Sequence, residues 1–271
     1  MKHFFFLFYT LVLCPHPKER TWTALGDSIT YLNDHQNETG NRITKGYMTR
    51  LAERLPGLHF INQGHNGWTV VRIAKEIENL QLEKSDVYTV FLGTNDWWHE
   101  EPLGTLQDYT GQTGNTTVCG SYRIIINKLR SLNKDAEIIL ITPMQRGDFV
   151  YIGNPHNNAW GSYKEKAGQS LSQFAAAIAA IGKLEHFKVV DLYNTKSLSV
   201  EHLVKFKRLK EPQTGTYKNF RYPDFINVPF NPDTDEYPYP VEAVDMTYDG
   251  LHPSDEGYKV ISDRLIRVMK K

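Results

Sequence analysis

Short apolar runs alternate along the chain with segments in which apolar residues recur every three or four positions. The short runs have the length and composition of buried strands, and they occupy residues 21–25, 58–62, 87–92, 138–142 and 189–192. The periodic segments have the spacing of helices that bury one face, and they cover residues 48–55, 70–77, 122–129, 167–181 and 258–268. This alternation predicts an α/β protein with a five-stranded parallel sheet. We expect a three-layer α/β/α sandwich in the flavodoxin-like arrangement, because right-handed crossovers leave few other topologies.

Residues 195–245 interrupt this alternation. The segment holds six of the thirteen prolines and shows no sustained periodicity, yet it carries eight aromatic residues. A stretch of this length without clear elements is usually a functional loop or a disordered linker, and the aromatic content argues against disorder. We therefore predict a single domain over residues 18–271 with an ordered excursion at 195–245, folded over one edge of the sheet. Its basic side chains are predicted to face solvent: Lys205, Lys207, Arg208 and Lys210.

The first residues have the pattern of an export signal. Lys2 precedes a mostly apolar run at 4–13, which is too short to span a membrane as a helix. We predict that residues 1–17 are a signal peptide or a lipoprotein signal region and that the protein is periplasmic, secreted or an outer-membrane lipoprotein; a buried first element is the alternative. Cys14 ends a sequence similar to a bacterial lipobox and is a candidate for lipid attachment, although Leu13 is larger than the residue usual before that cysteine.

Composition limits the partners and cofactors. The 271 residues carry 31 Lys and Arg against 31 Asp and Glu, and this formal net charge of 0 argues against binding to nucleic acid. Motifs for phosphate loops, dinucleotide binding, zinc proteases and the G-x-S-x-G nucleophile elbow are absent. Cys119 is the one cysteine outside the N-terminal region, so we expect no internal disulfide. The oligomeric state is left open.

Four blocks rich in polar residues lie next to the predicted strands or before the last helix. They cover residues 26–30, 62–69, 93–96 and 249–253. The first three come just past the first three strands, and the carboxyl ends of parallel strands meet at one edge of an open sheet, where ligands bind. We therefore expect the four blocks to converge.

The residue types in these blocks match the requirements of acyl transfer to a serine. Ser28 is the candidate nucleophile, His252 the base that takes its proton, and Asp249 the carboxylate that orients the histidine. The tetrahedral intermediate needs aimed hydrogen-bond donors, and the backbone N–H groups of Ser28 and Gly67 with the amide of Asn95 are candidates for this oxyanion hole. Each residue alone has a structural interpretation, such as a helix cap or a turn. Their joint occurrence in this order favours the catalytic interpretation.

In these blocks the sequence resembles the SGNH or GDSL hydrolases. The resemblance extends over residues 21–270, with Ser28, Gly67, Asn95 and His252 in the four block positions of the family and in its order; Asp249 matches the DxxH pattern of its histidine. One departure is Ile29, which stands where the name-giving motif has leucine. The resemblance implies a flavodoxin-like fold, no metal or other cofactor, and ester hydrolysis through an acyl-serine intermediate.

Tryptophans near the same edge suggest the type of substrate. Trp68 and Trp97 lie beside Gly67 and Asn95, and aromatic rings there suit the apolar faces of sugars as well as acyl chains. Together with export, this favours a carbohydrate esterase that removes acetyl groups. A lipase, lysophospholipase or thioesterase of the same fold is the alternative, and a non-catalytic glycan-binding protein is a second one.

A weak calcium pattern lies in the excursion. Asn231, Asp233 and Asp235 occupy positions one, three and five of a twelve-residue frame that ends at Glu242. The expected glycine at position six is Glu236, and we expect that the protein holds no metal; calcium at this loop is the alternative.

Overall fold

A parallel five-stranded sheet forms the centre of the computed structural model, which describes residues 19–270. The strand order is β2-β1-β3-β4-β7, and each pair of neighbours is parallel. The strands are β1 (Arg20–Gly26), β2 (Leu58–Gly64), β3 (Val87–Phe91), β4 (Glu137–Ile141) and β7 (Lys188–Val190). The predicted α/β class and the five-stranded parallel sheet are confirmed.

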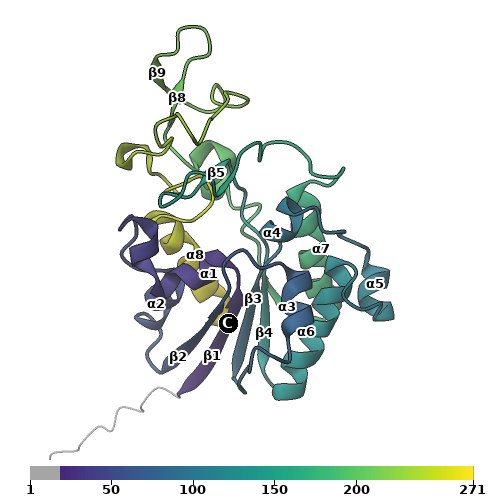
Figure 1. Cartoon of the computed structure of the whole chain (residues 1–271). Helices are drawn as coiled ribbons and strands as arrows, with labels where there is room; N and C mark the ends of the chain where they lie inside the picture. The colour runs from purple at the N-terminus through teal and green to yellow at the C-terminus, as the bar shows by residue number, and fades with distance from the viewer. Residues whose placement is uncertain (1–18, 271) are drawn as a thin grey trace, which may run out of the picture.

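The register of the sheet brings the strand ends to one level. Gly26 at the end of β1 is paired with Gly64 of β2 and with Phe91 of β3. Phe91 is paired with Ile141, which is paired in turn with Val190. The loops that follow the five strands therefore leave the sheet along one carboxyl edge, at the top of the view in Figure 1.

Helices cover both faces of the sheet and complete the three layers (Figure 1). One face packs against α2 (Tyr47–Ala52) and α8 (Asp255–Met269). The opposite face packs against α3 (Val70–Glu76), α6 (Val118–Leu132) and α7 (Leu171–Leu184). Each of these helices buries an apolar stripe, as the spacing in the sequence predicts.

Helix α7 begins later than its periodicity predicts. The apolar stripe suggests a start at Ala167, but this residue has a φ of 47°, outside the helical region, and the helix begins at Leu171. Ser170 and Gln173 form a capping box, which satisfies backbone N–H groups at the start of the helix and fixes its first turn.

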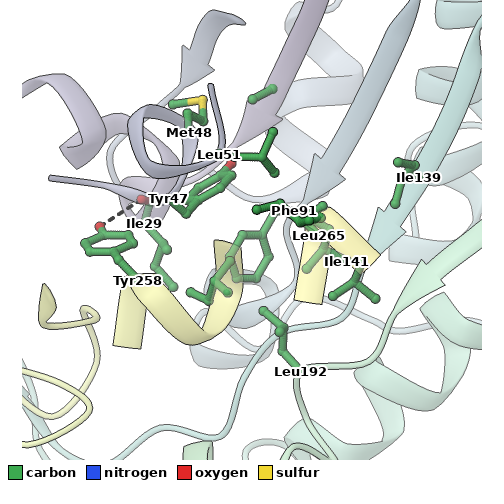
Figure 2. Close-up of a cluster of buried hydrophobic side chains, with 14 of the residues drawn as sticks. Ile29, Tyr47, Met48, Leu51, Phe91, Ile139, Ile141, Leu192, Tyr258 and Leu265 are labelled. Atoms are coloured by element: carbon green, nitrogen blue, oxygen red, sulfur yellow. Dashed lines mark hydrogen bonds between the residues drawn. The ribbon is translucent and has the colours of Figure 1, made fainter. Parts of the chain in front are cut away.

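The core under α2 and α8 links the first polar block to the last helix (Figure 2). The hydroxyl group of Tyr258 in α8 donates a 2.9 Å hydrogen bond to the carbonyl oxygen of Ile29, directly after Ser28. The rings of Tyr258 and Tyr47 stack with their centroids 6.3 Å apart, and both side chains are buried. The position of α8 is thereby fixed relative to the residues around Ser28.

Shorter elements make the loops at the carboxyl edge. The remaining α-helices are α1 (Ser28–Tyr31), α4 (Thr94–Trp98) and α5 (Leu106–Gly111). Two small antiparallel hairpins pair β5 (Phe149–Val150) with β6 (Asn158–Ala159) and β8 (Lys207–Lys210) with β9 (Tyr217–Phe220). The 3-10 helices are η1 (Leu32–Asp34), η2 (Gln36–Thr39), η3 (Lys196–Leu198), η4 (Val200–His202) and η5 (Val241–Ala243).

The excursion at 195–245 contains the β8–β9 hairpin and lies above the carboxyl edge, where Figure 1 shows β8 and β9 beyond β5. It shares a separate hydrophobic cluster with the β5–β6 hairpin, built on Val150, Val204, Leu209, Phe225 and Tyr239. We refer to the β5–β6 hairpin, the loop that follows it to Tyr163 and the excursion together as the cap.

One basic residue of the excursion does not face solvent. Lys207 is fully buried, whereas Arg208 and Lys210 on the same strand are partly exposed. Side chains alternate between the two faces of a strand, so Lys207 points inward together with Leu209. The prediction that all four basic residues are solvated is therefore wrong for Lys207.

The calcium pattern is not assembled in the fold. The Asp235 carboxylate lies 2.8 Å from Nζ of Lys210, and Asp233 lies 3.2 Å from Nε2 of His156. Within residues 19–270, no group of three or more His, Cys, Asp or Glu side chains is placed to hold a metal ion.

The predicted export signal at 1–17 and the candidate lipid attachment at Cys14 lie outside the described residues. Among residues 19–270, none of the helices has the length and apolar character needed to cross a membrane.

Candidate active site

The four polar blocks meet around one cavity at the carboxyl edge of the sheet. Its volume is about 390 Å³, and Ser28, Gly67, Asn95 and His252 all line it. The loops after β1, β2 and β3 supply the first three residues, and the segment before α8 supplies the histidine. The convergence expected from the parallel strands is therefore observed for these four blocks.

Ser28 is placed by the turn that ends β1 and begins α1. Asp27 is the N-cap of α1, and its carboxylate accepts a 2.9 Å hydrogen bond from the backbone N–H of Ile29. Ser28 is the first residue of the helix, so its own N–H lies in the first turn, where backbone donors have no acceptor within the helix. Burial raises the pKa of Asp27 to about 6, and the hydrogen bond from Ile29 opposes this shift.

Ser28, His252 and Asp249 form a continuous hydrogen-bonded chain. Oγ of Ser28 lies 2.9 Å from Nε2 of His252, and Nδ1 of His252 lies 2.7 Å from Oδ2 of Asp249. The carboxylate is held in turn, because Oδ1 of Asp249 accepts from the backbone N–H groups of Leu251 at 3.0 Å and of His252 at 2.7 Å. An ionised carboxylate only accepts, so Nδ1 carries the proton and Nε2 is free to accept the proton of Ser28. This geometry is the one that activates a serine hydroxyl.

Two aromatic rings enclose the histidine. The Phe149 ring meets the His252 ring edge-on with centroids 5.1 Å apart, and the Tyr248 ring lies nearly parallel to it at 5.9 Å. His252 is 7% exposed and Asp249 is 1% exposed. The imidazole has little room to rotate away from Ser28.

Gly67 and Asn95 line the same cavity as Ser28. Gly67 has a φ of 71°, a left-handed conformation that favours glycine. Nδ2 of Asn95 donates one hydrogen to the carbonyl oxygen of Trp68 at 3.0 Å, which leaves its second hydrogen for a ligand. The two loops are therefore tied together while each retains a donor beside the cavity.

Asp96 makes a second connection between these loops. Its buried carboxylate accepts from the backbone N–H of Val70 at 2.8 Å and 3.0 Å. Burial raises the pKa of Asp96 to about 7, with the hydrogen bonds from Val70 and Val71 acting in the opposite direction. Sequence reasoning did not single out Asp96; its position directly after Asn95 is the one signal that could have found it.

The predicted substrate-binding tryptophans are not in the cavity. Trp97 is 3% exposed, and its Nε1 donates a 2.9 Å hydrogen bond to the carbonyl oxygen of Gln169. Trp68 stacks on His65 with centroids 4.4 Å apart, and the Arg72 guanidinium lies 4.2 Å from its ring centroid. Neither ring is among the described residues that line the cavity, whereas that of Trp98 is. The helical turn of α4 explains the difference, because consecutive residues of a helix point in different directions.

Arg146 is a charged residue that sequence reasoning missed. It follows β4, lines the cavity and is 3% exposed. Its one hydrogen bond within the described residues is to Oγ1 of Thr94 at 3.4 Å, and its buried Nε has no partner there. Burial lowers the pKa of Arg146 to about 10, although the charge of Asp249 and other carboxylates opposes the shift. A guanidinium with unused donors beside a reactive serine can bind oxygen atoms of a ligand.

The cap contributes another part of the wall. Asn157 and Asn158 come from the β5–β6 hairpin, and Tyr151 lies between its strands. No motif marks these positions, since the two-residue strands are too short to show a period.

Comparison with known proteins identifies the family. The model of the GDSL-like lipase/acylhydrolase family matches residues 24–260, and the chain belongs to this family. Among curated protein sequences, none matches the chain significantly.

Solved structures agree with this assignment. The structure described as a possible lipase from Chitinophaga pinensis DSM 2588 is 60% identical, with a TM-score of 0.92 over 93% of this chain and 98% of that chain. An acetyl xylan esterase, AlAXEase, is 20% identical, with a TM-score of 0.53 over 90% of this chain and 97% of that one. A lipolytic protein of the G-D-S-L family from Veillonella parvula DSM 2008 is 14% identical, with a TM-score of 0.52 over 93% and 98%. The latter two share the fold, and the family membership makes this protein a hydrolase of ester bonds.

Proposed function

We propose that the protein is a serine esterase that removes short acyl groups, acetyl above all, from carbohydrates. The hydrogen-bonded chain from Ser28 through His252 to Asp249, set in a cavity lined by both polar and apolar side chains, is the observation that carries the proposal.

The first half of the reaction transfers the acyl group to the enzyme. Oγ of Ser28 attacks the ester carbonyl carbon while Nε2 of His252 takes the hydroxyl proton, and Asp249 stabilises the imidazolium that results. The carbonyl oxygen becomes an oxyanion that accepts hydrogen bonds from the N–H groups of Ser28 and Gly67 and from Asn95. When the intermediate collapses, the ester C–O bond breaks and His252 gives its proton to the departing alcohol.

The second half releases the acid. A water molecule takes the place of the alcohol, His252 removes its proton, and the water oxygen attacks the acyl carbon. The same three donors hold the second oxyanion, and its collapse returns the proton to Oγ of Ser28 as the carboxylic acid leaves. Each step uses groups of this chain and water alone.

The lining of the cavity supports a carbohydrate as the alcohol portion. Asn66 and Asn157 offer neutral donors and acceptors, and Arg146 offers a buried Nε without a partner among the described residues. The ring of Trp98 adds an aromatic surface of the kind that packs on a sugar. The cavity of about 390 Å³ accommodates a sugar unit and a small acyl group better than a long chain.

A lipase or thioesterase is the second candidate. The 60% identical Chitinophaga pinensis protein is described as a possible lipase, and Leu32, Phe149 and Leu251 give this cavity an apolar part. Acyl-chain length separates the two candidates. A purely glycan-binding protein is disfavoured, because binding alone does not require the aligned serine, histidine and carboxylate.

The experiment compares release of acetate from acetylated xylo-oligosaccharides with hydrolysis of p-nitrophenyl acetate, butyrate and octanoate. We expect fast acetate release and rates that decline with chain length, and both Ser28→Ala and His252→Ala should abolish turnover. Faster hydrolysis of octanoate than of acetate would favour the lipase. Equal rates in the wild type and both variants would contradict the serine mechanism.

We also propose that the protein is exported, in keeping with the signal-like residues 1–17. If Cys14 is the site of lipid attachment, the protein should partition into membranes and Cys14→Ser should release it. Recovery of the wild-type protein in the soluble periplasmic or extracellular fraction, cleaved near residue 17, would identify an ordinary signal peptide instead.

A further inference from the structure

A buried ion pair joins the excursion to the loop that follows β4. Lys207, the first residue of β8, has its Nζ 2.6 Å from Oδ2 of Asp148, and their side chains are 0% and 3% exposed. Four aromatic rings lie around the ammonium group with centroids 4.3–5.9 Å away, those of Trp160, Tyr163, Phe225 and Tyr239. Such a pair is weak evidence for stability, because apolar side chains of similar volume often stabilise a core as well or better. The ion pair and the hydrogen bonds of Asp148 instead suggest that the pair fixes the position of the backbone around Asp148.

All the acceptor groups of Asp148 are engaged by the cap. Oδ1 accepts hydrogen bonds from the backbone N–H groups of Gly161 at 2.6 Å and Ser162 at 2.7 Å. The backbone carbonyl oxygen of Asp148 accepts from the Tyr239 hydroxyl group. Two parts of the excursion and one part of the preceding loop therefore determine where Asp148 lies.

The neighbours of Asp148 touch the catalytic histidine loop. The backbone N–H of Gly147 donates a 2.8 Å hydrogen bond to the carbonyl oxygen of Gly250, between Asp249 and His252. Gly250 has a φ of 88°, and a Cβ there would overlap the carbonyl oxygen of Asp148. On the other side of Asp148, the Phe149 ring packs edge-on against His252. The backbone of residues 147–149 thus lies directly against the loop that carries the triad carboxylate and base.

We propose that Lys207 and Asp148 are positioning residues for His252. Through this pair the excursion fixes the backbone of residues 147–149. These residues in turn keep the loop of Asp249 and His252 in the position in which Nε2 of His252 contacts Oγ of Ser28. The proposal rests on the Ser28–His252 mechanism, and it makes the excursion part of the catalytic apparatus as well as a wall of the cavity. A displacement of a catalytic group by about 1 Å can lower a rate about hundredfold, so a small shift of this loop is sufficient.

The titration of the pair gives a signature that is separate from folding. Burial lowers the pKa of Lys207 from 10.5 to about 8, although the Asp148 carboxylate opposes the shift. Tyr163 and Tyr239 face the same ammonium group and stay neutral, since burial raises the pKa of both, and the Arg146 charge acts on Asp148. As the pH rises through about 8, Lys207 loses its proton and the ion pair is lost.

The effect on stability has the opposite sign. Between about pH 8 and pH 10.5 the unfolded chain binds more protons at Lys207 than the folded protein does. The free energy of unfolding therefore rises with pH in this window as far as Lys207 is concerned. In the same pH window we therefore expect kcat to decline although the titration of Lys207 does not destabilise the fold.

The experiment measures the pH dependence of kcat with p-nitrophenyl acetate in the whole protein, with thermal melts at the same pH values. The wild-type kcat should fall as the pH passes about 8, with no parallel fall in Tm. Lys207→Arg keeps a positive charge that does not titrate near pH 8, so the decline of kcat should move to higher pH. Lys207→Met should lower kcat about tenfold or more at neutral pH and remove the fall.

Two further variants control for general damage. Tyr239→Phe keeps the ring and removes the hydroxyl contact to Asp148, so it should lower kcat to a smaller extent with little change in Tm. Lys210 lies on the same strand as Lys207 and pairs with Asp235, with its own side chain partly exposed. Lys210→Met should keep the wild-type profile.

Two results would overturn the proposal: losses of kcat that follow the unfolded fraction in every variant, or an alkaline fall that Lys207→Arg leaves in place. The Ser28→Ala variant shows whether the positioning role of Lys207 and Asp148 has failed or the serine mechanism itself. If Ser28→Ala retains turnover, the serine mechanism is wrong. If it abolishes turnover while the folded Lys207 variants match the wild type, the positioning role alone is wrong.

Discussion

The sheet and the cap are built on different principles, although both face the same cavity. The core of the sheet is formed mainly by aliphatic side chains on parallel strands and amphipathic helices. The cap instead packs aromatic side chains around a buried ion pair and has two short hairpins. The loops at the carboxyl edge of the sheet supply Ser28, Gly67 and Asn95 to the lining of this cavity, and the cap supplies Asn157 and Asn158. We infer that the regular part of the fold places Ser28 and the proposed oxyanion donors, whereas the cap completes the cavity and, through Lys207 and Asp148, holds the histidine loop.

The largest effect should come from the sheet. Ser28→Ala removes the nucleophile, so kcat for p-nitrophenyl acetate should fall by about 10⁴-fold or more, while the fold is preserved because Ser28 is not a core residue. Circular dichroism and Tm provide the control for folding. Residual turnover within tenfold of the wild type would show that another group reacts.

The next effect tests the oxyanion hole. Asn95→Ala removes one donor, and kcat should fall about 10²–10³-fold with a small change in KM, because the donor acts on the transition state. Steady-state kinetics separate the two parameters. A rise in KM at constant kcat would instead assign Asn95 to substrate binding.

A matched pair of core substitutions compares the two regions directly. Phe174 in α7 and Phe225 in the cap are both fully buried, and truncation of either to Ala should destabilise the protein by about 3–5 kcal/mol. The effects on function should differ. Below the melting temperature, Phe174→Ala should keep most of its kcat, whereas Phe225→Ala should lose activity because the cap loosens around Lys207.

Denaturant unfolding and kinetics on the same samples test this pair. Equal retention of kcat in both variants would mean that the cap does not influence the reaction.

The smallest effect concerns selectivity. Trp98→Ala should raise KM for acetylated xylo-oligosaccharides by up to about tenfold, since an aromatic contact contributes about 0.5–1.5 kcal/mol. Trp97→Phe, a change inside the core, is the matched control and should leave KM near the wild-type value. Identical KM values for both variants would remove Trp98 from the substrate site.

The sequence was sufficient for the sheet and for most of the reactive edge. Apolar runs placed all five strands, and the parallel arrangement implied that the blocks containing Ser28, Gly67 and Asn95 would meet. The end of β7 was misplaced, because Leu192 leaves the sheet to donate a hydrogen bond to Oγ1 of Thr142. The spacing of apolar residues reflects which side of a helix or strand is buried, so it predicts secondary structure where the elements are long and regular.

The cap was less predictable because its order comes from contacts between distant segments. Lys207 is buried only because Asp148, 59 residues earlier, and rings from several loops surround it. Arg146 carries no motif, and its role depends on a cavity that exists only in the folded chain. Whether Trp97 or Trp98 lines the cavity depends on a single residue step in a short helix, and it is Trp98 that does so.

The bond between Ser28 and His252 joins positions 224 residues apart in the sequence. A chain that has formed the sheet but has not docked α8 therefore has a nucleophile and no base. Esterase activity should consequently return last during refolding, after the far-ultraviolet signal of secondary structure has recovered. The rate at which a refolding mixture hydrolyses a chromogenic ester should therefore measure the fraction of native molecules, without a contribution from compact intermediates.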